Sequence, residues 1–151
     1  MLTRKIVICK LFISVLLSIG MAMPVSAAPG DDFLFTGQVM TPGQSRLSTN
    51  GVYRFIFQHD GNLVVYKNEI SPIWHSGTHG SNATRLIMQN DGNLVLYSDD
   101  NAVLWHSHTG VNFGDFDVET LTMQNDGNLV IYAFGGDITV YAVWDSKGYA
   151  P

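Results

Sequence analysis

One nine-residue pattern occurs three times in the chain. It reads QHDGNLVVY at residues 58–66, QNDGNLVLY at 89–97 and QNDGNLVIY at 124–132, and a tryptophan follows each copy, at Trp74, Trp105 and Trp144. Self-similarity at a period of roughly 31 to 39 residues is typical of folds built from repeated units. Most of the repeated residues are polar, and packing alone would not require them. The pattern therefore indicates a repeated site as well as a repeated architecture.

The first 27 residues have the composition of a secretory signal peptide. Three basic residues precede a largely apolar stretch at 11–23, and Val25-Ser26-Ala27 supplies the small residues that signal peptidase reads. We expect cleavage after Ala27, with Ala28 as the alternative, and a secreted protein in the periplasm or outside the cell. An uncleaved membrane anchor is the competing interpretation.

Cleavage would leave residues 28–151 as one acidic domain without cysteine. The whole chain has eight Lys and Arg and thirteen Asp and Glu. Three of the basic residues and no acidic residue lie in the signal, so five against thirteen gives a formal charge of −8. Such a surface argues against nucleic acid and anionic membranes as partners, and we expect no membrane insertion. The single cysteine, Cys9, would leave with the signal, so we expect no disulfide.

The part of the chain after residue 30 has the pattern of an all-β domain. Short runs rich in β-branched and aromatic residues alternate with Gly, Asn, Asp and Ser clusters, and no long 3.6-residue periodicity is present. Eleven or twelve short strands in three units fit a closed, threefold arrangement of sheets. The expected strands are 33–35, 38–40, 53–58, 63–67, 72–75, 85–89, 94–98, 103–106, 120–124, 129–133 and 140–145.

Each repeat is predicted to be a hairpin with a third strand that ends at its tryptophan. The D-G-N segment is a strong turn signal because glycine adopts positive φ readily. In the returning strand of the first repeat, alternation places Asn62, Val64 and Tyr66 on one face and Leu63 and Val65 on the other. The face with Leu63 and Val65, and its counterparts in the other repeats, should point to the core. The three tryptophans should fill a central axis.

The third repeat is the least regular. The segment 134–139 predicts a longer loop before Trp144, and residues 111–117 form an insertion before the third copy. We place Asp115, Asp117 and Glu119 in this insertion. The third site should therefore have different neighbours from the other two.

The repeated polar set matches the chemistry of a sugar. Asp provides a carboxylate acceptor, Asn and Gln provide donors and acceptors, and Tyr provides a hydroxyl on a rigid arm, while Val matches the C–H face of a pyranose. We expect a shallow groove and an affinity in the millimolar range, about −4 kcal/mol per site. The competing interpretation is a turn with a solvated face, which explains Asp, Gly and Asn but not the fixed offsets of Gln and Tyr.

The motif Q-x-D-x-N-x-V-x-Y in three copies resembles that of the bulb-type, or monocot mannose-binding, lectins. The resemblance covers the chain from about residue 31 to 147. It implies a β-prism of three four-stranded antiparallel sheets with pseudo-threefold symmetry, tryptophans near the axis, and recognition of α-D-mannose without a metal or cofactor.

The resemblance also assigns roles to the repeated residues. Asp and Asn would bond the axial 2-hydroxyl, Gln the 3-hydroxyl and Tyr the 4-hydroxyl, and Val would touch the ring carbons. The first site would be Gln58, Asp60, Asn62, Val64 and Tyr66, the second Gln89, Asp91, Asn93, Val95 and Tyr97, and the third Gln124, Asp126, Asn128, Val130 and Tyr132.

The sequence departs from the plant pattern in two ways. Plant members usually carry a disulfide, whereas here Gly61 stands where one of those cysteines commonly lies. The chain ends seven residues after Trp144, and plant members often exchange a C-terminal strand to dimerise. A homodimer is thus one arrangement that the sequence leaves open.

Other sites receive little support. Five histidines could in principle bind a metal, but positions at exposed strand ends explain them better, and each D-G-N turn offers one carboxylate where calcium loops use several. No paired carboxylates or nucleophile signature suits catalysis, so we expect no enzyme, and Asp99-Asp100 is read as a polar turn. Asn82-Ala83-Thr84 is a glycosylation sequon that we expect to be unused. The histidines are His59, His75, His79, His106 and His108.

Three functions compete on this sequence. The first is a secreted lectin that binds mannose or mannose-rich glycans and gains avidity from three sites. The second is a lectin-like bacteriocin or toxin that docks on surface polysaccharide, although the chain has no room for a separate killing domain. The third is a protein-interaction module on the same fold, which intact motifs make the weakest of the three.

Overall fold

A computed structural model describes residues 32–110, 117–135 and 139–148. The predicted signal peptide and residues 111–116 of the predicted insertion lie outside the described residues, as do residues 136–138 of the predicted loop. The described strands are β1 (Phe33–Phe35), β2 (Val39–Met40), β3 (Ser45–Leu47), β4 (Tyr53–Phe57), β5 (Leu63–Lys67), β6 (Ser71–His75), β7 (Ala83–Met88), β8 (Leu94–Ser98), β9 (Val103–His106), β10 (Asp117–Met123), β11 (Leu129–Phe134) and β12 (Val140–Asp145).

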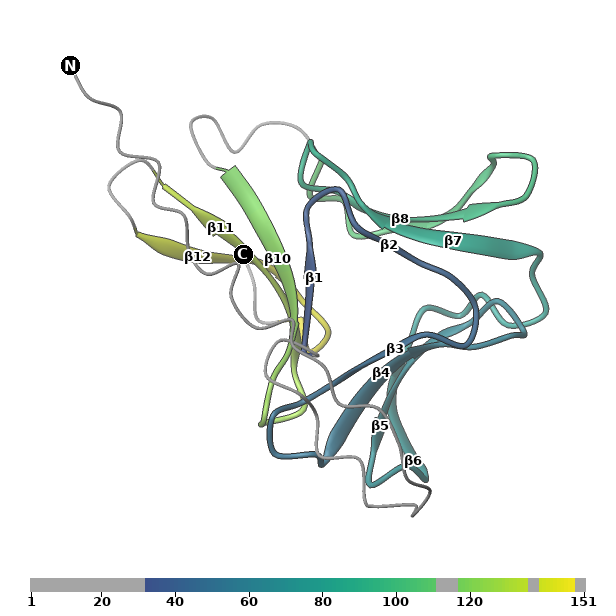
Figure 1. Cartoon of the computed structure of the whole chain (residues 1–151), viewed down its shortest axis with the longest axis horizontal. Helices are drawn as coiled ribbons and strands as arrows, with labels where there is room; N and C mark the ends of the chain where they lie inside the picture. Colours follow the sequence, from purple (N-terminus) through teal and green to yellow (C-terminus); the bar gives the residue numbers. More distant parts are fainter. Residues whose placement is uncertain (1–31, 111–116, 136–138, 149–151) are drawn as a thin grey trace, which may run out of the picture.

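The strands form three four-stranded antiparallel sheets that stand like the sides of a prism (Figure 1). Their orders are β3-β4-β5-β6, β2-β7-β8-β9 and β1-β10-β11-β12. Each sequence repeat thus supplies three consecutive strands of one sheet. The predicted architecture of three four-stranded sheets is confirmed.

The fourth strand of each sheet comes from the start of the described chain. β1, β2 and β3 follow one another within residues 33–47, yet each pairs with a different sheet. β1 pairs with β10 through Phe33 and Thr122, and β3 pairs with β4 through Leu47 and Arg54. The N-terminal segment therefore crosses all three sides of the prism.

A β-bulge precedes each tryptophan. β5 and β6 pair Val65 with Trp74 but Tyr66 with Pro72, so Ile73 is an extra residue on β6. A bulge turns the strand and changes the direction of the neighbouring side chain. Because Trp74 lies opposite the buried Val65, its indole faces the interior. The corresponding bulged residues in the other repeats are Leu104 and Val143.

The three tryptophans meet at the centre of the prism, as predicted. Their ring centroids are 5.7 to 5.8 Å apart in all three pairs, with interplanar angles of 75° to 81°. Edge-to-face rings at this spacing interact favourably. The inward Leu, Val and Ile residues of the returning strands are buried around them in one core, again as predicted. These are Leu63, Val65, Leu94, Leu96, Leu129 and Ile131.

Two expectations about the strands need correction. β3 is not among the expected strands, because its residues Ser-Arg-Leu are few and lack apolar alternation. Asp117 and Glu119 lie in β10 and not in the insertion, because β10 begins at Asp117 and continues the ladder with Phe134 and Ala133 of β11. Tertiary pairing outweighs the low strand propensity of acidic residues here. Asp115 lies outside the described residues.

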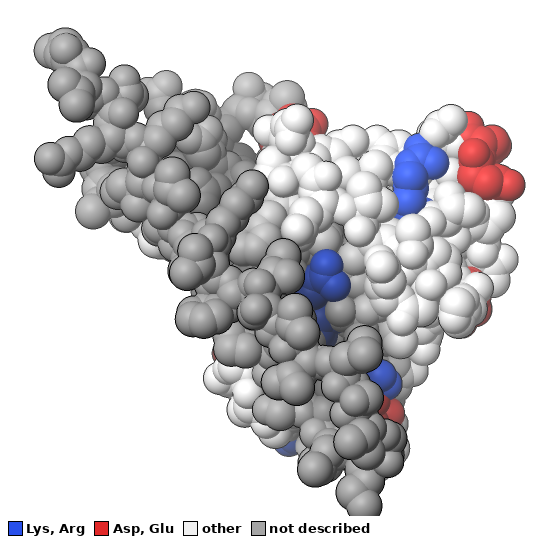
Figure 2. Space-filling model, viewed as in Figure 1, with Lys and Arg blue, Asp and Glu red and all other residues white. Residues whose placement is uncertain are grey.

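Charged side chains are scattered over the visible part of the described surface. In Figure 2 most of the described atoms on the viewed face belong to uncharged residues, and acidic and basic groups adjoin one another near one corner. The described residues contain no helix that is long and apolar enough to span a membrane.

Candidate functional site: three polar clusters on the outer faces of the sheets

Each copy of the nine-residue motif brings its five repeated side chains together on the outer side of one sheet. In the first copy the β4–β5 register pairs Ile56 with Val64 and Phe57 with Leu63. Gln58 follows Ile56 by two positions and therefore shares the face of Val64 and Tyr66. The same register holds for the second and third copies, so Val95 and Tyr97 share one face of their sheet, and Val130 and Tyr132 share the matching face of theirs.

A hydrogen bond joins the glutamine and the tyrosine of each copy. Gln58 Nε2 donates to Tyr66 Oη at 3.0 Å, and Gln89 Nε2 donates to Tyr97 Oη at 2.8 Å. Gln124 and Tyr132 make the same bond. Because each Tyr oxygen accepts from Gln, its own proton remains able to point toward a ligand.

The aspartate of each copy closes the turn. Asp60 Oδ1 accepts the backbone N–H of Asn62 at 3.0 Å, and the turn glycine Gly61 has φ of +85°. This local bond is the Asx-type turn expected for Asp followed by Gly. One carboxylate oxygen is thus used by the fold, while the exposed side chain still presents the other. The equivalent bonds join Asp91 to Asn93 and Asp126 to Asn128.

A serine that the sequence analysis did not single out holds each asparagine. Ser76 Oγ donates to Asn62 Oδ1 at 3.1 Å and accepts the backbone N–H of Leu63 at 3.0 Å. Asn62 Oδ1 is thereby occupied, which fixes the amide so that its N–H₂ group is the part available to a ligand. The signal was present as the repeated W-x-S that includes Ser107 and Ser146, which make the same two contacts in their own repeats.

Threonine adds a second support in the first two copies. Thr78 N donates to Asn62 Oδ1 at 3.1 Å, and Thr78 Oγ1 donates to the carbonyl of Gly61 at 2.8 Å. Thr109 repeats both bonds with Asn93 and Gly92. The third copy has Gly148 at this position, which lacks the hydroxyl.

The valine of each copy is more buried than a sugar-contacting residue on an open surface would be. Val64, Val95 and Val130 are 3%, 2% and 2% exposed. They lie on the outer face and outside the core cluster, so neighbouring side chains of the same face cover them. Only a small part of each valine is left to touch a ligand.

The flanking strands make the third site different from the other two. Tyr66 and Tyr97 lie opposite Arg54 and Arg85, whereas Tyr132 lies opposite Thr120. The valines likewise adjoin His75 and His106 in the first two sites and Asp145 in the third. The third site thus differs from the other two in its strand neighbours, whereas residues 111–116 and 136–138, in the segments on which the prediction was based, lie outside the described residues.

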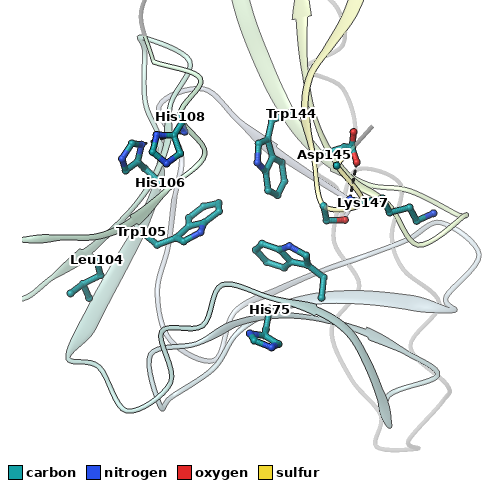
Figure 3. A pocket seen from close by; sticks show the side chains of 11 residues that line it. His75, Leu104, Trp105, His106, His108, Trp144, Asp145 and Lys147 are labelled. Atoms are coloured by element: carbon teal, nitrogen blue, oxygen red, sulfur yellow. Dashed lines mark hydrogen bonds between the residues drawn. The ribbon is translucent and has the colours of Figure 1, made fainter. Parts of the chain in front are cut away.

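A cavity of about 650 Å³ lies elsewhere, beside the tryptophan triangle (Figure 3). Its lining includes all three indoles, His75, His106 and Lys147, and none of the fifteen motif residues. Within the described parts of the chain, no group of three or more His, Cys, Asp or Glu is arranged to hold a metal ion.

Removing the serine support should weaken both the fold and the second site. In Ser107→Ala the buried backbone N–H of Leu94 loses its acceptor and Asn93 Oδ1 loses a donor. An unsatisfied buried group costs about 1–3 kcal/mol, so we expect a loss of about 2 kcal/mol in the free energy of unfolding by denaturant titration. Ser71→Ala, at an exposed position of β6, is the control. An unchanged unfolding midpoint in Ser107→Ala would show that the serine is not a support.

Known proteins share this pattern of strands and residues. No protein-family model matches the chain. In sequence, 50 residues are 42% identical to the mannose-specific lectin of Narcissus pseudonarcissus, and 52 residues are 38% identical to the B-type lectin plumieribetin of Scorpaena plumieri. These matches cover 33% and 34% of this chain and 43% and 44% of the relatives. The match therefore spans less than half the length of these relatives.

Solved structures match over more of their length. The monomeric monocot mannose-binding lectins of Gastrodia elata superpose with a TM-score of 0.63 at 39% identity, over 80% of this chain and 99% of theirs. The mannose-specific agglutinin of snowdrop, Galanthus nivalis, solved with methyl-α-D-mannoside, gives a TM-score of 0.59 at 38% identity, over 68% and 89%. A Marasmius oreades lectin gives 0.67 at 32% identity, over 78% and 92%.

Proposed function

Because the chain belongs to the bulb-type, or monocot mannose-binding, lectin family, we propose that it is a secreted lectin that binds mannose-containing glycans without a metal. The family consists of sugar-binding proteins and not of enzymes. The proposed targets are mannose-rich polysaccharides or glycoproteins outside the cell that makes the protein. Export rests on the signal-like residues 1–27 of the sequence.

One observation carries the proposal. In all three copies the same internal hydrogen bonds occupy one atom of each polar side chain, and in the first two copies these bonds leave the second carboxylate oxygen of the aspartate for a ligand. Oδ1 of Asp60 and Oδ1 of Asn62 are used by the fold, while Tyr66 accepts from Gln58. Prior ordering of these side chains lowers the entropy cost of binding a flexible, polar ligand.

The proposed contacts follow from this arrangement. The second carboxylate oxygen of Asp60 accepts the axial 2-hydroxyl of mannose, and the N–H₂ of Asn62 donates to the same hydroxyl. Gln58 contacts the 3-hydroxyl, Tyr66 contacts the 4-hydroxyl, and the exposed edge of Val64 touches ring carbons. The second and third copies would act in the same way through Gln89, Asp91, Asn93, Val95, Tyr97, Gln124, Asp126, Asn128, Val130 and Tyr132.

Weak single sites suit a protein that works by avidity. Three sites on the three sides of one prism cannot all face a single sugar, but they can engage neighbouring branches or separate glycans. A homodimer would double the number of sites.

Calorimetric titration of the mature chain, residues 28–151, tests the proposal. We expect saturable heat with methyl α-mannoside, with Kd on the order of 1 mM, and no change when EDTA is added. Methyl α-glucoside is the matched control because it differs only in the 2-hydroxyl, which is equatorial and points away from the Asp–Asn pair. Absence of heat at tens of millimolar mannoside, or equal heat from both sugars, would refute the proposed specificity.

A further inference from the structure

The third site carries a lysine that its two counterparts lack. The residue three positions after the tryptophan is Gly77 in the first repeat, His108 in the second and Lys147 in the third. Lys147 Nζ lies 3.1 Å from the carbonyl oxygen of Asp126 and 3.5 Å from its Oδ2. This is one of two ion pairs among the described residues, and neither of them involves Asp60 or Asp91.

Lys147 is held in this position at its backbone as well. Its N–H donates to Asp145 Oδ1 at 2.7 Å, the contact drawn in Figure 3, where the lysine side chain extends away from the tryptophans. Asp145 stands where the other repeats have His75 and His106. His108 makes the equivalent backbone contact, because its N–H donates to His106 Nδ1 at 3.3 Å. Its side chain differs from that of Lys147, because its ring lies 3.8 Å from the His106 ring between centroids.

The ion pair engages the atom that a sugar would need. Asp126 Oδ1 already accepts the N–H of Asn128, and Oδ2 is the remaining acceptor. In the third site Lys147 lies beside that oxygen, so an incoming hydroxyl must compete with an ammonium group. Gly148 supplies no hydroxyl in place of Thr78 and Thr109, and in this turn Lys147 Nζ bonds the carbonyl of Asp126 instead.

We propose that Lys147 weakens the third site for neutral mannosides, so that the chain has two matched stronger sites and one weaker site. This inference rests on the proposed mannose-binding function and adds a difference between its sites. The side chains of Lys147 and Asp126 are 36% and 63% exposed, and exposed ion pairs are worth little. The expected difference in Kd is therefore about two- to fivefold, not a complete loss.

Each site contains its own spectroscopic reporter. The backbone amides of Asn62, Asn93 and Asn128 each donate to the aspartate of their own site. In a ¹⁵N-labelled mature chain titrated with methyl α-mannoside, we expect the first two amides to give the same Kd and the third a value about two- to fivefold higher. Lys147→Met should bring the third curve to the other two.

Two controls test whether a change in the third site comes from the Lys147–Asp126 ion pair and not from the loss of any lysine. Lys67→Met removes a lysine at the exposed end of β5, outside the three sites, and should leave all three curves unchanged. High salt should reduce the difference in Kd between the third site and the other two in the parent chain, because it screens the exposed Lys147–Asp126 ion pair.

The outcomes distinguish the inference from the function on which it rests. Equal Kd values at all three sites of the parent chain would refute the role of Lys147 and leave the proposed mannose binding intact. A weak third site that Lys147→Met does not change would do the same. If no amide shifts at any site, the proposed function itself fails.

Discussion

Replacement of both Asp91 and Asn93 by alanine should abolish mannoside binding at the second site and leave a folded protein. The change removes the carboxylate and the amide proposed to bind the 2-hydroxyl, which is the group that distinguishes mannose from glucose. Sites that hydrogen-bond a hydroxyl lose most of their affinity when those partners are deleted. In calorimetry the number of binding sites should fall by one.

The structure also predicts what the double change does to stability. Asp91 Oδ1 closes an exposed turn, and Asn93 Oδ1 accepts from Ser107 Oγ at 3.1 Å and from Thr109 N at 3.3 Å. Loss of these bonds should lower the free energy of unfolding by about 1–2 kcal/mol, measured by denaturant titration. Asp99→Ala, which removes an exposed carboxylate from the far end of the same hairpin, is the charge control.

A milder variant distinguishes the role of Asp91 in binding the sugar from its role in stabilising the turn. Asp91→Asn keeps an oxygen that can accept the N–H of Asn93 but removes the carboxylate charge. It should weaken the second site while stability stays within about 0.5 kcal/mol of the parent. Global unfolding of the double variant together with normal binding by Asp91→Asn would mean that the motif serves the fold and not the ligand.

Trp105→Ala should produce the largest loss of stability of any change considered. The indole packs edge-to-face against both Trp74 and Trp144 at centroid distances of 5.8 Å and against the core of its own sheet. Tryptophan-to-alanine changes in cores cost about 3–5 kcal/mol, a large part of the 5–15 kcal/mol that stabilises a typical domain. Without a disulfide in residues 28–151, no covalent link would offset the loss.

Denaturant unfolding of matched variants tests this expectation. Val103→Ala is the control, because Val103 lies on the same strand but is 54% exposed. This substitution should lower the free energy of unfolding only slightly. A double-mutant cycle with Trp74→Ala should give a coupling of about 0.5–1.5 kcal/mol for the ring pair. A loss below about 1 kcal/mol for Trp105→Ala would mean that the triangle is not a main source of stability.

Much of the fold was predictable because the repeats mark strands, turns and faces together. The D-G-N turns set the hairpin register, and alternation then placed Leu63 and Val65 inside and Asn62 and Tyr66 outside. Strands without a repeated signal were harder. β3 has three residues and no alternation, and only its pairing with β4 makes it a strand. The acidic start of β10 was missed for the same reason, because non-local pairing decided its structure.

The shared face of the motif residues was predictable from the sequence, but the side chains that hold them in place were not. The five motif positions share a face, as alternation requires, yet the burial of Val64 depends on side chains of the neighbouring strands. Ser76 was overlooked because serine after an aromatic strand reads as a turn residue, and its bond to Asn62 spans fourteen positions. The contact between Lys147 and Asp126 likewise depends on where β12 ends relative to the β10–β11 turn.

The crossing of the N-terminal segment determines when the domain can be completed during folding. A hairpin such as β4–β5 can form from local contacts alone, but β1 must find β10, and Phe33 and Thr122 stand about 90 positions apart. Closing so long a loop is entropically costly and slow. In a linear repeat array a missing end unit merely shortens the stack. Here the loss of residues 33–47 would expose an unpaired strand edge on every sheet at once, and such edges promote aggregation.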